Sequence, residues 1–444
     1  MVPLNRFLAE AVEFPVARVV ADLEDHGYPV DAEYLRTLRG QLMPRRQQVL
    51  AEIRTEAARH GMAEFNPNSP GQVQKLVYDK LGRRVVARTT NGSPSVDAVT
   101  LTAFAAVDPI IGQILEFREL ARTVGTYCAI ADQVDDDGRY RVSYDSLGAE
   151  TGRFTSKSLI QTLPRDDRHG VRAAFRAEPG YRIVAADYEQ QELRILAALS
   201  DDPALRSAIR DGVDLHGAAA VKVFDLDCEP HEVKTRYPRE REQVKAIQYG
   251  VLYGRGAAGI ARELGIANED AMRLIGDYFS EFPAVKEFMA EVESRVCRDG
   301  YVDDCFGRRR HIPDAQIAVP GAPYVRLSQT EKSQVAMRNR AIRAAQNFVI
   351  QGPAATITKL AMIATHRFGW QFPGDGAELI LSLHDELQFH VPIDLAADLA
   401  NQLPALMAEL PIRRFGITVP MAVTVSIGPS WGELSPWASK HAPA

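Results

Sequence analysis

Two apolar segments separated by a short polar stretch lie near the end of the chain. Residues 379–383 and 387–391 run or alternate apolar as half-buried strands do, and His384, Asp385 and Glu386 lie between them. This pattern predicts a β-hairpin with acids at its turn. Because carboxylates at the end of a hydrophobic hairpin are costly unless a cation meets them, we expect a divalent metal ion there.

A second acidic strand end is predicted far upstream. Residues 181–186 form a short apolar run that ends at Asp187, and Leu193 and Leu196 follow at helical spacing. Asp187 therefore lies at a strand-to-helix junction, where a lone Asp would serve well as a helix N-cap. Paired with Asp385, it could instead hold Mg²⁺ together with substrate phosphates, which is the coordination that this ion prefers.

A third segment supplies positive charge and aromatic rings. Residues 239–254 predict a helix on which Arg241, Lys245, Tyr249 and Tyr253 recur at intervals of four. At about 3.6 residues per turn, these side chains form one slowly drifting stripe. Each of them alone fits a solvated charge or a core aromatic residue. The ordered stripe favours a nucleoside triphosphate, whose phosphates would contact the cations and whose base would stack on the rings.

Composition agrees with a globular enzyme rather than a coating protein. The chain has 444 residues, of which 46% are hydrophobic and 25% charged, which is enough for several packed regions. The formal net charge of −6 argues against a protein that simply coats nucleic acid, since such a surface is basic overall. Basic residues instead gather locally, in residues 234–245, 308–311 and 338–343. These clusters could contact phosphates, although a solvated face is the alternative for each.

The sequence shows no sign of secretion or of a membrane span. Four cysteines form no CxxC pair and have no zinc spacing, which favours reduced thiols in the cytosol. The N-terminus lacks the apolar core of a signal peptide, and no apolar run approaches the roughly 20 residues that span a bilayer. We therefore expect a cytoplasmic protein without a membrane partner.

Together, these segments resemble the three motifs of the family A DNA polymerases. Residues 187–194 (Asp-Tyr-Glu-Gln-Gln-Glu-Leu-Arg) resemble the first motif, the helix at 241–254 the second, and residues 384–386 the third. Supporting matches lie at residues 151–156 with Gln161 and Pro164, at 300–302 with 307–310 and 313–314, and at 343–347 with 351–352 and 354–355. The resemblance extends from about Phe14 to Val425, and the order and spacing of its motifs make it specific.

The resemblance implies an α+β protein with the right-hand polymerase fold, in which a helical thumb and helical fingers flank an antiparallel palm sheet. The sheet would combine residues 139–144 with the strand before Asp187 and the hairpin around Asp385. The implied regions are an N-terminal extension at 1–13, the thumb at 14–138, the palm at 139–201 and 361–444, and the fingers at 202–360. Only about 13 residues precede the thumb, too few for an exonuclease domain, so we expect no intrinsic proofreading.

Catalytic roles follow from the resemblance residue by residue. Asp187 and Asp385, with the backbone carbonyl of Tyr188, would hold two Mg²⁺ ions, for which Mn²⁺ could substitute. Glu386 would be an accessory acid beside them. Lys245 would protonate the leaving pyrophosphate and hold the triphosphate.

Substrate contacts are implied in the same way. Arg241 would share the triphosphate with Lys245, Tyr253 would stack at the new base pair, and Tyr249 and Gln190 would line the nucleotide site. Glu192 would exclude a ribose 2′-hydroxyl and so select deoxynucleotides. The implied DNA contacts are Arg153, Gln161, Arg343, Asn347, Gln351 and His384. Several of these would read the minor groove, whose acceptors are shared by all base pairs.

Some positions depart from the usual family pattern. Tyr249 stands where many members have Phe, and its hydroxyl could replace the hydrogen bond lost when a nucleotide lacks its 3′-hydroxyl. We therefore expect ready incorporation of dideoxynucleotides. Glu189 and Gln191 replace Ser and an aliphatic residue, and Thr356 stands where Asp is common. None of these changes touches the expected metal ligands.

Other functions remain open at this point. A metal-dependent nuclease also uses carboxylates on strand ends, but it has no need of the stripe of cations and tyrosines. A catalytically inactive protein that binds primer-template DNA would have no use for metal ligands. RNA synthesis is disfavoured by Glu192. The expected partners of the polymerase are primer-template DNA and deoxynucleoside triphosphates (dNTPs), with a separate exonuclease or replisome proteins beside a monomeric enzyme in a bacterial cell or a phage-infected host.

Overall fold

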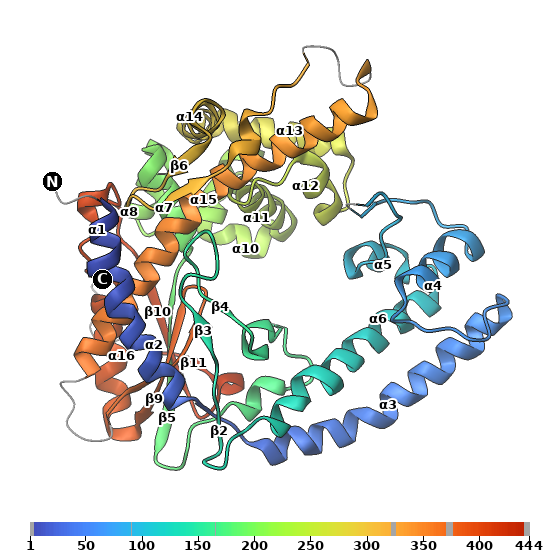
Figure 1. Ribbon diagram of the computed structural model, residues 1–444, viewed down its shortest axis with the longest axis horizontal. Helices are drawn as coiled ribbons and strands as arrows, with labels where there is room; N and C mark the ends of the chain where they lie inside the picture. The colour runs from blue at the N-terminus through green and yellow to red at the C-terminus, as the bar shows by residue number, and fades with distance from the viewer. Residues whose placement is uncertain (1–3, 90, 165, 321–325, 370–375, 439–444) are drawn as a thin grey trace.

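A five-stranded antiparallel sheet lies at the centre of the computed structural model, which describes residues 4–89, 91–164, 166–320, 326–369 and 376–438 (Figure 1). Its strand order is β11-β10-β5-β9-β8. These strands are β5 (Tyr181–Tyr188), β8 (Glu378–Leu383), β9 (Glu386–Pro392), β10 (Val423–Gly428) and β11 (Ser435–Pro436). The expected antiparallel palm sheet and α+β class are confirmed.

The hairpin that the apolar pattern predicts is the β8–β9 pair. Its two-residue turn is His384-Asp385, and His384 adopts a left-handed backbone conformation with φ 59°. The expectation that these strands are half-buried is wrong for both, because even the polar residues Ser382 of β8 and Gln388 and His390 of β9 are only 3%, 0% and 1% exposed. A second layer covers that face: the Tyr28 hydroxyl donates to the Gln388 side chain at 2.7 Å.

The expected first palm strand, residues 139–144, is not part of the central sheet. It divides into β2 (Arg139–Tyr140), which pairs with β1 (Tyr28–Pro29), and β3 (Tyr144–Asp145), which pairs with β4 (Thr155–Ser156). The place beside β5 is taken by β10, near the end of the chain. Alternation in the sequence indicates a strand but does not specify its partner.

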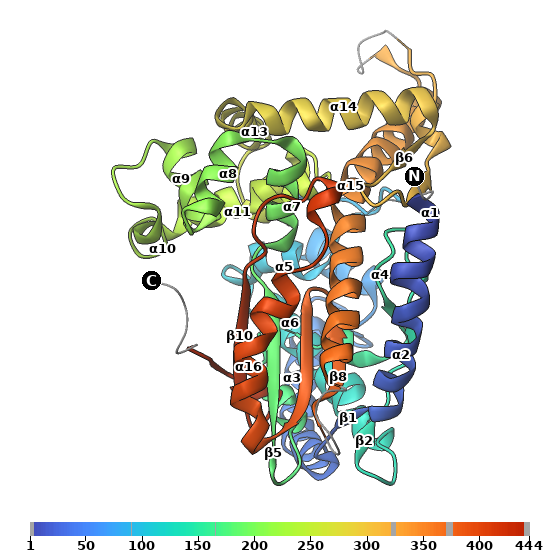
Figure 2. The ribbon, with the colours of Figure 1, turned by 90° about the vertical axis from the view of Figure 1, so that its left-hand side faces the viewer.

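Several helices pack against the sheet or follow its strands in the chain. They are α2 (Phe14–His26), α7 (Gln191–Ser200), α15 (Gln329–Gly369) and α16 (Ile393–Ala408), preceded by α1 (Leu4–Phe7) and η1 (Leu8–Glu13). Figure 2 shows α2, α15 and α16 in front of the strands. By length and hydropathy, α15 alone among the described helices could cross a membrane, yet 89% of its most apolar stretch is buried, as in a core helix.

A helical arm with its own core projects from this body, on the right of Figure 1. It contains α3 (Ala32–Arg59), α4 (Pro70–Gln74), α5 (Ala98–Ala105) and α6 (Pro109–Arg122). Its buried core runs from Val49 to Leu120, inside the predicted thumb. The amphipathic helices α3 and α6 pack along each other, which is why the arm can extend away from the main core.

A third group of helices lies above the sheet in Figure 2 and falls within the predicted fingers. It comprises α8 (Pro203–Arg210), α9 (Leu215–Phe224), α10 (Val233–Arg236), α11 (Pro238–Leu252), α12 (Ala257–Leu264), α13 (Asn268–Glu281) and α14 (Pro283–Asp299). The short hairpin of β6 (Tyr301–Asp303) and β7 (Arg309–His311) follows them. The helix α15 runs without a break from this group into the palm.

A buried cluster of charged side chains connects three segments that lie far apart in the sequence. Glu13 accepts hydrogen bonds from Arg308 at 2.6 Å and from Lys359 at 2.8 and 3.0 Å. The Lys359 side chain is fully buried, and its ammonium also donates to the backbone carbonyl of Ser146 at 2.7 Å. One carboxylate therefore joins the N-terminal helix, the β6–β7 hairpin and α15.

Candidate active site

Sheet register brings the two predicted acidic strand ends together. Asp187, near the end of β5, is paired in register with Glu386 at the start of β9. The backbone N–H of Tyr188 donates to the carbonyl of Asp385 at 3.3 Å. The side chains of Asp187 and Asp385 are both half-buried and line one cavity. Residues almost two hundred positions apart thus meet because antiparallel strands place their ends side by side.

The alternative role of Asp187 as a helix N-cap is wrong. The residue before α7 is Gln190, in a left-handed conformation with φ 52°, and it makes no side-chain cap to the helix. The Gln190 amide instead donates to Asp214 at 3.5 Å. The Asp187 carboxylate therefore belongs to the strand end and not to the helix.

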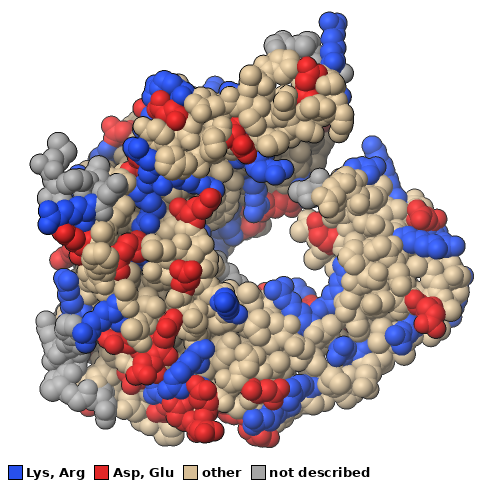
Figure 3. All heavy atoms as spheres, viewed as in Figure 1, with Lys and Arg blue, Asp and Glu red and all other residues tan. Residues whose placement is uncertain are grey.

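The cavity is about 530 Å³ and is walled by both the palm and the fingers. Its wall consists of Arg153, Asp187, Tyr188, Gln190, Gln191, Glu192, Leu193, Lys245, Tyr249, Tyr253, Arg255, Glu263, His384 and Asp385. It thus collects most of the residues predicted to bind metal or nucleotide. Figure 3 shows a wide opening through the middle of the molecule, with Lys and Arg side chains at several points on its rim.

The predicted stripe of cations and rings lies on α11, with one correction. The helix ends at Leu252, so Tyr253 is the residue that caps it and is not part of it. Gly254 follows with φ 61° and approaches Arg343 so closely that a Cβ would meet the arginine Cβ at 2.5 Å. The turn nevertheless keeps the two tyrosine rings stacked, with the centroids of Tyr249 and Tyr253 5.8 Å apart and an 11° angle between ring planes.

Glu192 connects the palm to the fingers. Its carboxylate forms a short ion pair with Arg153 and a hydrogen bond with Tyr253. Burial raises the pKa of Glu192, although the charge of Arg153 opposes this shift. Burial and the neighbouring Glu192 carboxylate raise the pKa of Tyr253. The predicted sugar-selecting residue is therefore held between a predicted DNA contact and a predicted base-stacking residue.

The two cations of the stripe have different partners. Arg241 donates from Nε and Nη2 to one oxygen of Asp214, at 3.0 and 2.9 Å. Lys245 pairs only loosely with Glu242, one turn away on the same helix, at 3.7 Å, and its side chain is 41% exposed. Lys245 lines the cavity. Arg241 lies one turn earlier on the same helix and is not part of the cavity wall.

The predicted DNA contacts spread over neighbouring surfaces. Gln161 and His384 share a small cavity of about 50 Å³ with Arg153. Arg343 lines a larger opening of about 840 Å³, between the fingers and the tip of the thumb. Asn347 and Gln351 follow Arg343 at intervals of four along α15, so the three share one side of the helix. The buried Oδ1 of Asn347 has no hydrogen-bond partner among the described residues.

Sequence patterns missed three residues of this region. Asp214 holds Arg241, and His216 contacts Gln248 of α11 at 2.5 Å. Gln388 donates to Glu386 and accepts from Tyr28, so it orients the predicted accessory acid. An Asp before a helix looks like an ordinary cap, and a polar residue in a strand looks solvent-facing, so neither sequence signal distinguishes these residues.

The donor set fits a metal ion that is shared with substrate. Within the described ranges, no group of three or more His, Cys, Asp or Glu side chains is arranged as a metal cage. Asp187 and Asp385 offer two carboxylates and Tyr188 a backbone carbonyl, at an open cavity. Mg²⁺ commonly takes one or two carboxylates and completes its shell with water and substrate phosphates. These oxygens therefore fit such an ion without a protein cage.

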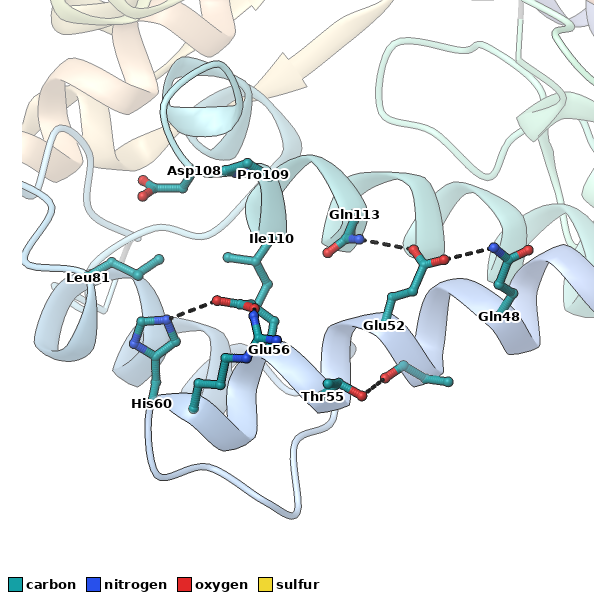
Figure 4. A pocket seen from close by; sticks show the side chains of 12 residues that line it. Gln48, Glu52, Thr55, Glu56, His60, Leu81, Asp108, Pro109, Ile110 and Gln113 are labelled. Carbon is teal, nitrogen blue, oxygen red and sulfur yellow. Dashed lines mark hydrogen bonds and ion pairs between the residues drawn. The ribbon is translucent and has the colours of Figure 1, made fainter.

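Cavity size alone does not identify the site. A cavity of about 790 Å³ lies in the thumb, between α3 and α6 (Figure 4). Its polar side chains bond one another: Glu52 accepts from Gln48 at 2.8 Å and from Gln113 at 3.0 Å, and His60 lies 3.7 Å from Glu56. Its wall contains none of the predicted site residues, so chemistry rather than volume identifies the site.

Comparison with known proteins identifies one family. The sequence profile described as DNA polymerase family A matches residues 32–433. DNA polymerase I of Chloroflexus aurantiacus is 34% identical over 436 residues, which are 96% of this chain and 43% of that protein. The thermostable DNA polymerase I of Thermus filiformis is 34% identical over 433 residues, which cover 96% of this chain and 48% of that protein. This chain thus spans less than half the length of these two relatives.

A solved structure is similar over almost the whole chain. It is the POL domain of Pol1 from M. smegmatis, in complex with DNA primer-template and dNTP. The two structures superpose with a TM-score of 0.83 at 30% sequence identity, and the match covers 96% of this chain and 71% of the other. The right-hand polymerase fold is therefore confirmed.

Proposed function

The chain belongs to DNA polymerase family A, and we propose that it extends a DNA primer on a template by adding deoxynucleotides to the 3′-hydroxyl, with release of pyrophosphate. One observation carries this proposal. The acids of β5 and of the β8–β9 turn share a single cavity with the cation and the tyrosines of α11. Acids that suit metal ions, a cation that suits phosphates and rings that suit a base are the groups that nucleotidyl transfer requires.

Asp187 and Asp385, with the Tyr188 carbonyl, would hold two Mg²⁺ ions, and Mn²⁺ could substitute for them. Bound there, these ions would lower the pKa of the primer hydroxyl and neutralise charge on the pyrophosphate. Lys245 is the residue on α11 that can protonate the leaving group, because it lines the cavity and its ammonium pairs only loosely with Glu242. Glu386 acts beside the metal ligands.

On the fingers side, Arg241 and Lys245 bind the triphosphate. Tyr253 stacks on the new base pair, while Tyr249 and Gln190 complete the nucleotide pocket. The buried Glu192, held by Arg153 and Tyr253, occupies the position at which a ribose 2′-hydroxyl would collide. If Glu192→Ala excluded ribonucleotides as well as the native protein does, this assignment would be wrong.

Duplex DNA would lie in the central opening, between the thumb arm and the palm. Arg153, Gln161 and His384 would contact the primer terminus, and Arg343, Asn347 and Gln351 would follow the minor groove along α15. The M. smegmatis POL domain was solved with both DNA primer-template and dNTP, which supports these two partners. We propose the regional boundaries given above, a monomeric enzyme, and action in the cytoplasm of a bacterial cell or a phage-infected host.

The test is extension of a labelled primer with Mg²⁺ and four dNTPs, by the native protein and by Asp385→Ala. Asp394→Ala, which removes an exposed carboxylate from the first turn of α16, is the matched control. We expect template-directed growth that disappears only in Asp385→Ala. Primer shortening would support the nuclease instead. Tight primer-template binding with no change in primer length would support the inactive binding protein.

A further inference from the structure

A carboxylate outside the predicted site connects two of its residues. Asp214 is the N-cap of α9, and its Oδ1 accepts from the backbone N–H of His216 at 3.1 Å. The same oxygen lies 3.5 Å from the side-chain nitrogen of Gln190, which follows the strand end of Asp187. Its other oxygen, Oδ2, accepts from Nε and Nη2 of Arg241 on α11. One side chain thus holds the palm edge of the cavity and the start of α11 together.

The pair of Asp214 and Arg241 is well shielded from water, because the two side chains are 24% and 19% exposed. Burial alone would raise the pKa of Asp214, but the hydrogen bond and the charge of Arg241 outweigh it and lower that pKa. Asp214 is therefore ionised at neutral pH, and the ion pair is present in the protein before any nucleotide binds.

The geometry leaves part of the guanidinium available. A guanidinium has five N–H donors in a fixed fork, and Asp214 uses the edge formed by Nε and Nη2. Nη1 and the second N–H of Nη2 can still bind phosphate oxygens. An arginine that is already held in one rotamer loses less conformational entropy when it binds a ligand, so its affinity for the ligand is higher.

We propose that Asp214 is a positioning residue, which presents Arg241 and Gln190 to the triphosphate of the incoming nucleotide. This inference rests on the proposed function, in which Arg241 binds that triphosphate. It assigns to α9 a part in nucleotide binding, through a residue that need not touch the nucleotide. Asp214 would chiefly lower the KM for dNTP, because it acts on the ligand-binding side chains and not on the reacting atoms.

Capping of α9 is a separate role that the test must exclude. Ser and Asn cap helices about as well as Asp, so neither substitution should unfold α9. Ser is too short to reach Arg241. Asn has a single acceptor oxygen, and while that oxygen caps α9 its amide nitrogen, a donor, faces the guanidinium. Asp214→Ser and Asp214→Asn therefore both remove the arginine contact and retain the cap.

The experiment measures kcat and KM for insertion of a single dNTP on primer-template DNA. We expect Asp214→Ser and Asp214→Asn each to raise KM by about tenfold with little change in kcat, since neither leaves an oxygen that accepts from Arg241 while α9 is capped. Asp202→Ser is the matched control. Asp202 caps α8 and accepts from the backbone N–H groups of Ala204 and Leu205. The Asp202→Ser enzyme should therefore have the native KM for dNTP.

A double-mutant cycle isolates the contact with Arg241. In an Arg241→Ala background, Asp214→Ser should raise KM much less than in the native background, because only Gln190 is left to position. A native KM for Asp214→Ser, or an equal rise with and without Arg241, would overturn the inference.

Failure of the proposed function gives a different result. If the native protein extends no primer, calorimetric titration with dATP still compares the native protein with Asp214→Ser. Weaker dATP binding by Asp214→Ser would then support the positioning role, although DNA synthesis had been excluded. Equal binding, or no binding to the native protein, would exclude the positioning role as well.

Discussion

The palm half and the fingers half of the site are held in place by different means. In the palm, Asp187 and Asp385 are placed by the backbone, through strand register and a two-residue turn next to buried strands. In the fingers, Arg241 is held by a side chain on another helix, and Lys245 only by a loose pair at 3.7 Å. The half proposed to bind metal ions is therefore built before substrate arrives, whereas in the half proposed to bind phosphate Lys245 would be held firmly only once the nucleotide binds. This fits a fingers region that closes on its substrate.

The largest expected effect distinguishes the palm half of the site from the fingers half, because variants of the two halves should respond differently to the dNTP concentration. We expect Asp187→Asn to lower the extension rate by about 1,000-fold or more at every dNTP concentration, because several kcal/mol of charge stabilisation are lost. Lys245→Ala should cost about 100-fold at low dNTP and recover in part at saturation, since part of its role is binding.

Steady-state kinetics over a wide range of dNTP concentrations measures both variants. Lys222→Ala, on the exposed surface of the neighbouring α9, is the control for loss of a lysine. Recovery of Asp187→Asn at high dNTP would contradict a prebuilt palm half.

The stability of the protein should depend on the ion cluster around Glu13, which joins the N-terminal helix, the β6–β7 hairpin and α15. Glu13→Gln leaves the buried Lys359 and the nearby Arg308 without their shared carboxylate. We expect the free energy of unfolding to fall by about 3 kcal/mol, as for other buried ion pairs that lose one partner. Urea denaturation measures the change. Glu10→Gln, which removes an exposed carboxylate one turn earlier, should have little effect.

A buried acid at the same junction should make stability depend on pH. Asp304 is 5% exposed, next to Gly352 of α15, and burial raises the pKa of its carboxyl to about 6. The folded state thus favours the protonated form, so the stabilisation is full below the usual Asp pKa of about 4 and is lost as the pH rises through 6.

Relative to Asp304→Asn, which cannot ionise, the native protein should lose up to about 3 kcal/mol of stability between pH 4 and pH 7. Denaturation curves of both proteins across this range measure the difference. The exposed neighbour Asp303 provides the control substitution, Asp303→Asn. A constant difference between the native protein and Asp304→Asn would show that the fold does not raise the pKa of Asp304.

The smallest effect concerns one hydroxyl on the fingers side. The Tyr249 hydroxyl is expected to replace the hydrogen bond that a dideoxynucleotide cannot make. Tyr249→Phe should therefore discriminate about tenfold more strongly against dideoxynucleotides, which is the value of one hydrogen bond of about 1.4 kcal/mol. Competition between each dideoxynucleotide and its normal counterpart measures this ratio. Equal ratios for the two proteins would exclude the role of the hydroxyl.

Much of the site could be predicted because its signals are local. The hairpin around Asp385, the strand that ends at Asp187 and most of the α11 stripe each follow from spacing within about 15 neighbouring residues. The end of α11 was placed two residues too late, since the helix ends at Leu252 and Tyr253 is its cap. Helix ends depend on the turn that follows, here the close approach of Gly254 to Arg343, which spacing does not reveal.

Most elements, their chemistry and the family follow from the chain alone, because periodicity and motif order are properties of the sequence. The tertiary structure decided which partners these elements meet. Residues 139–144 form short ribbons outside the main sheet, because β10 pairs with β5 in their place. Gln388 is buried because Tyr28, 360 residues away in sequence, reaches it. Such contacts form between side chains that only the folded chain brings together, so no local pattern encodes them.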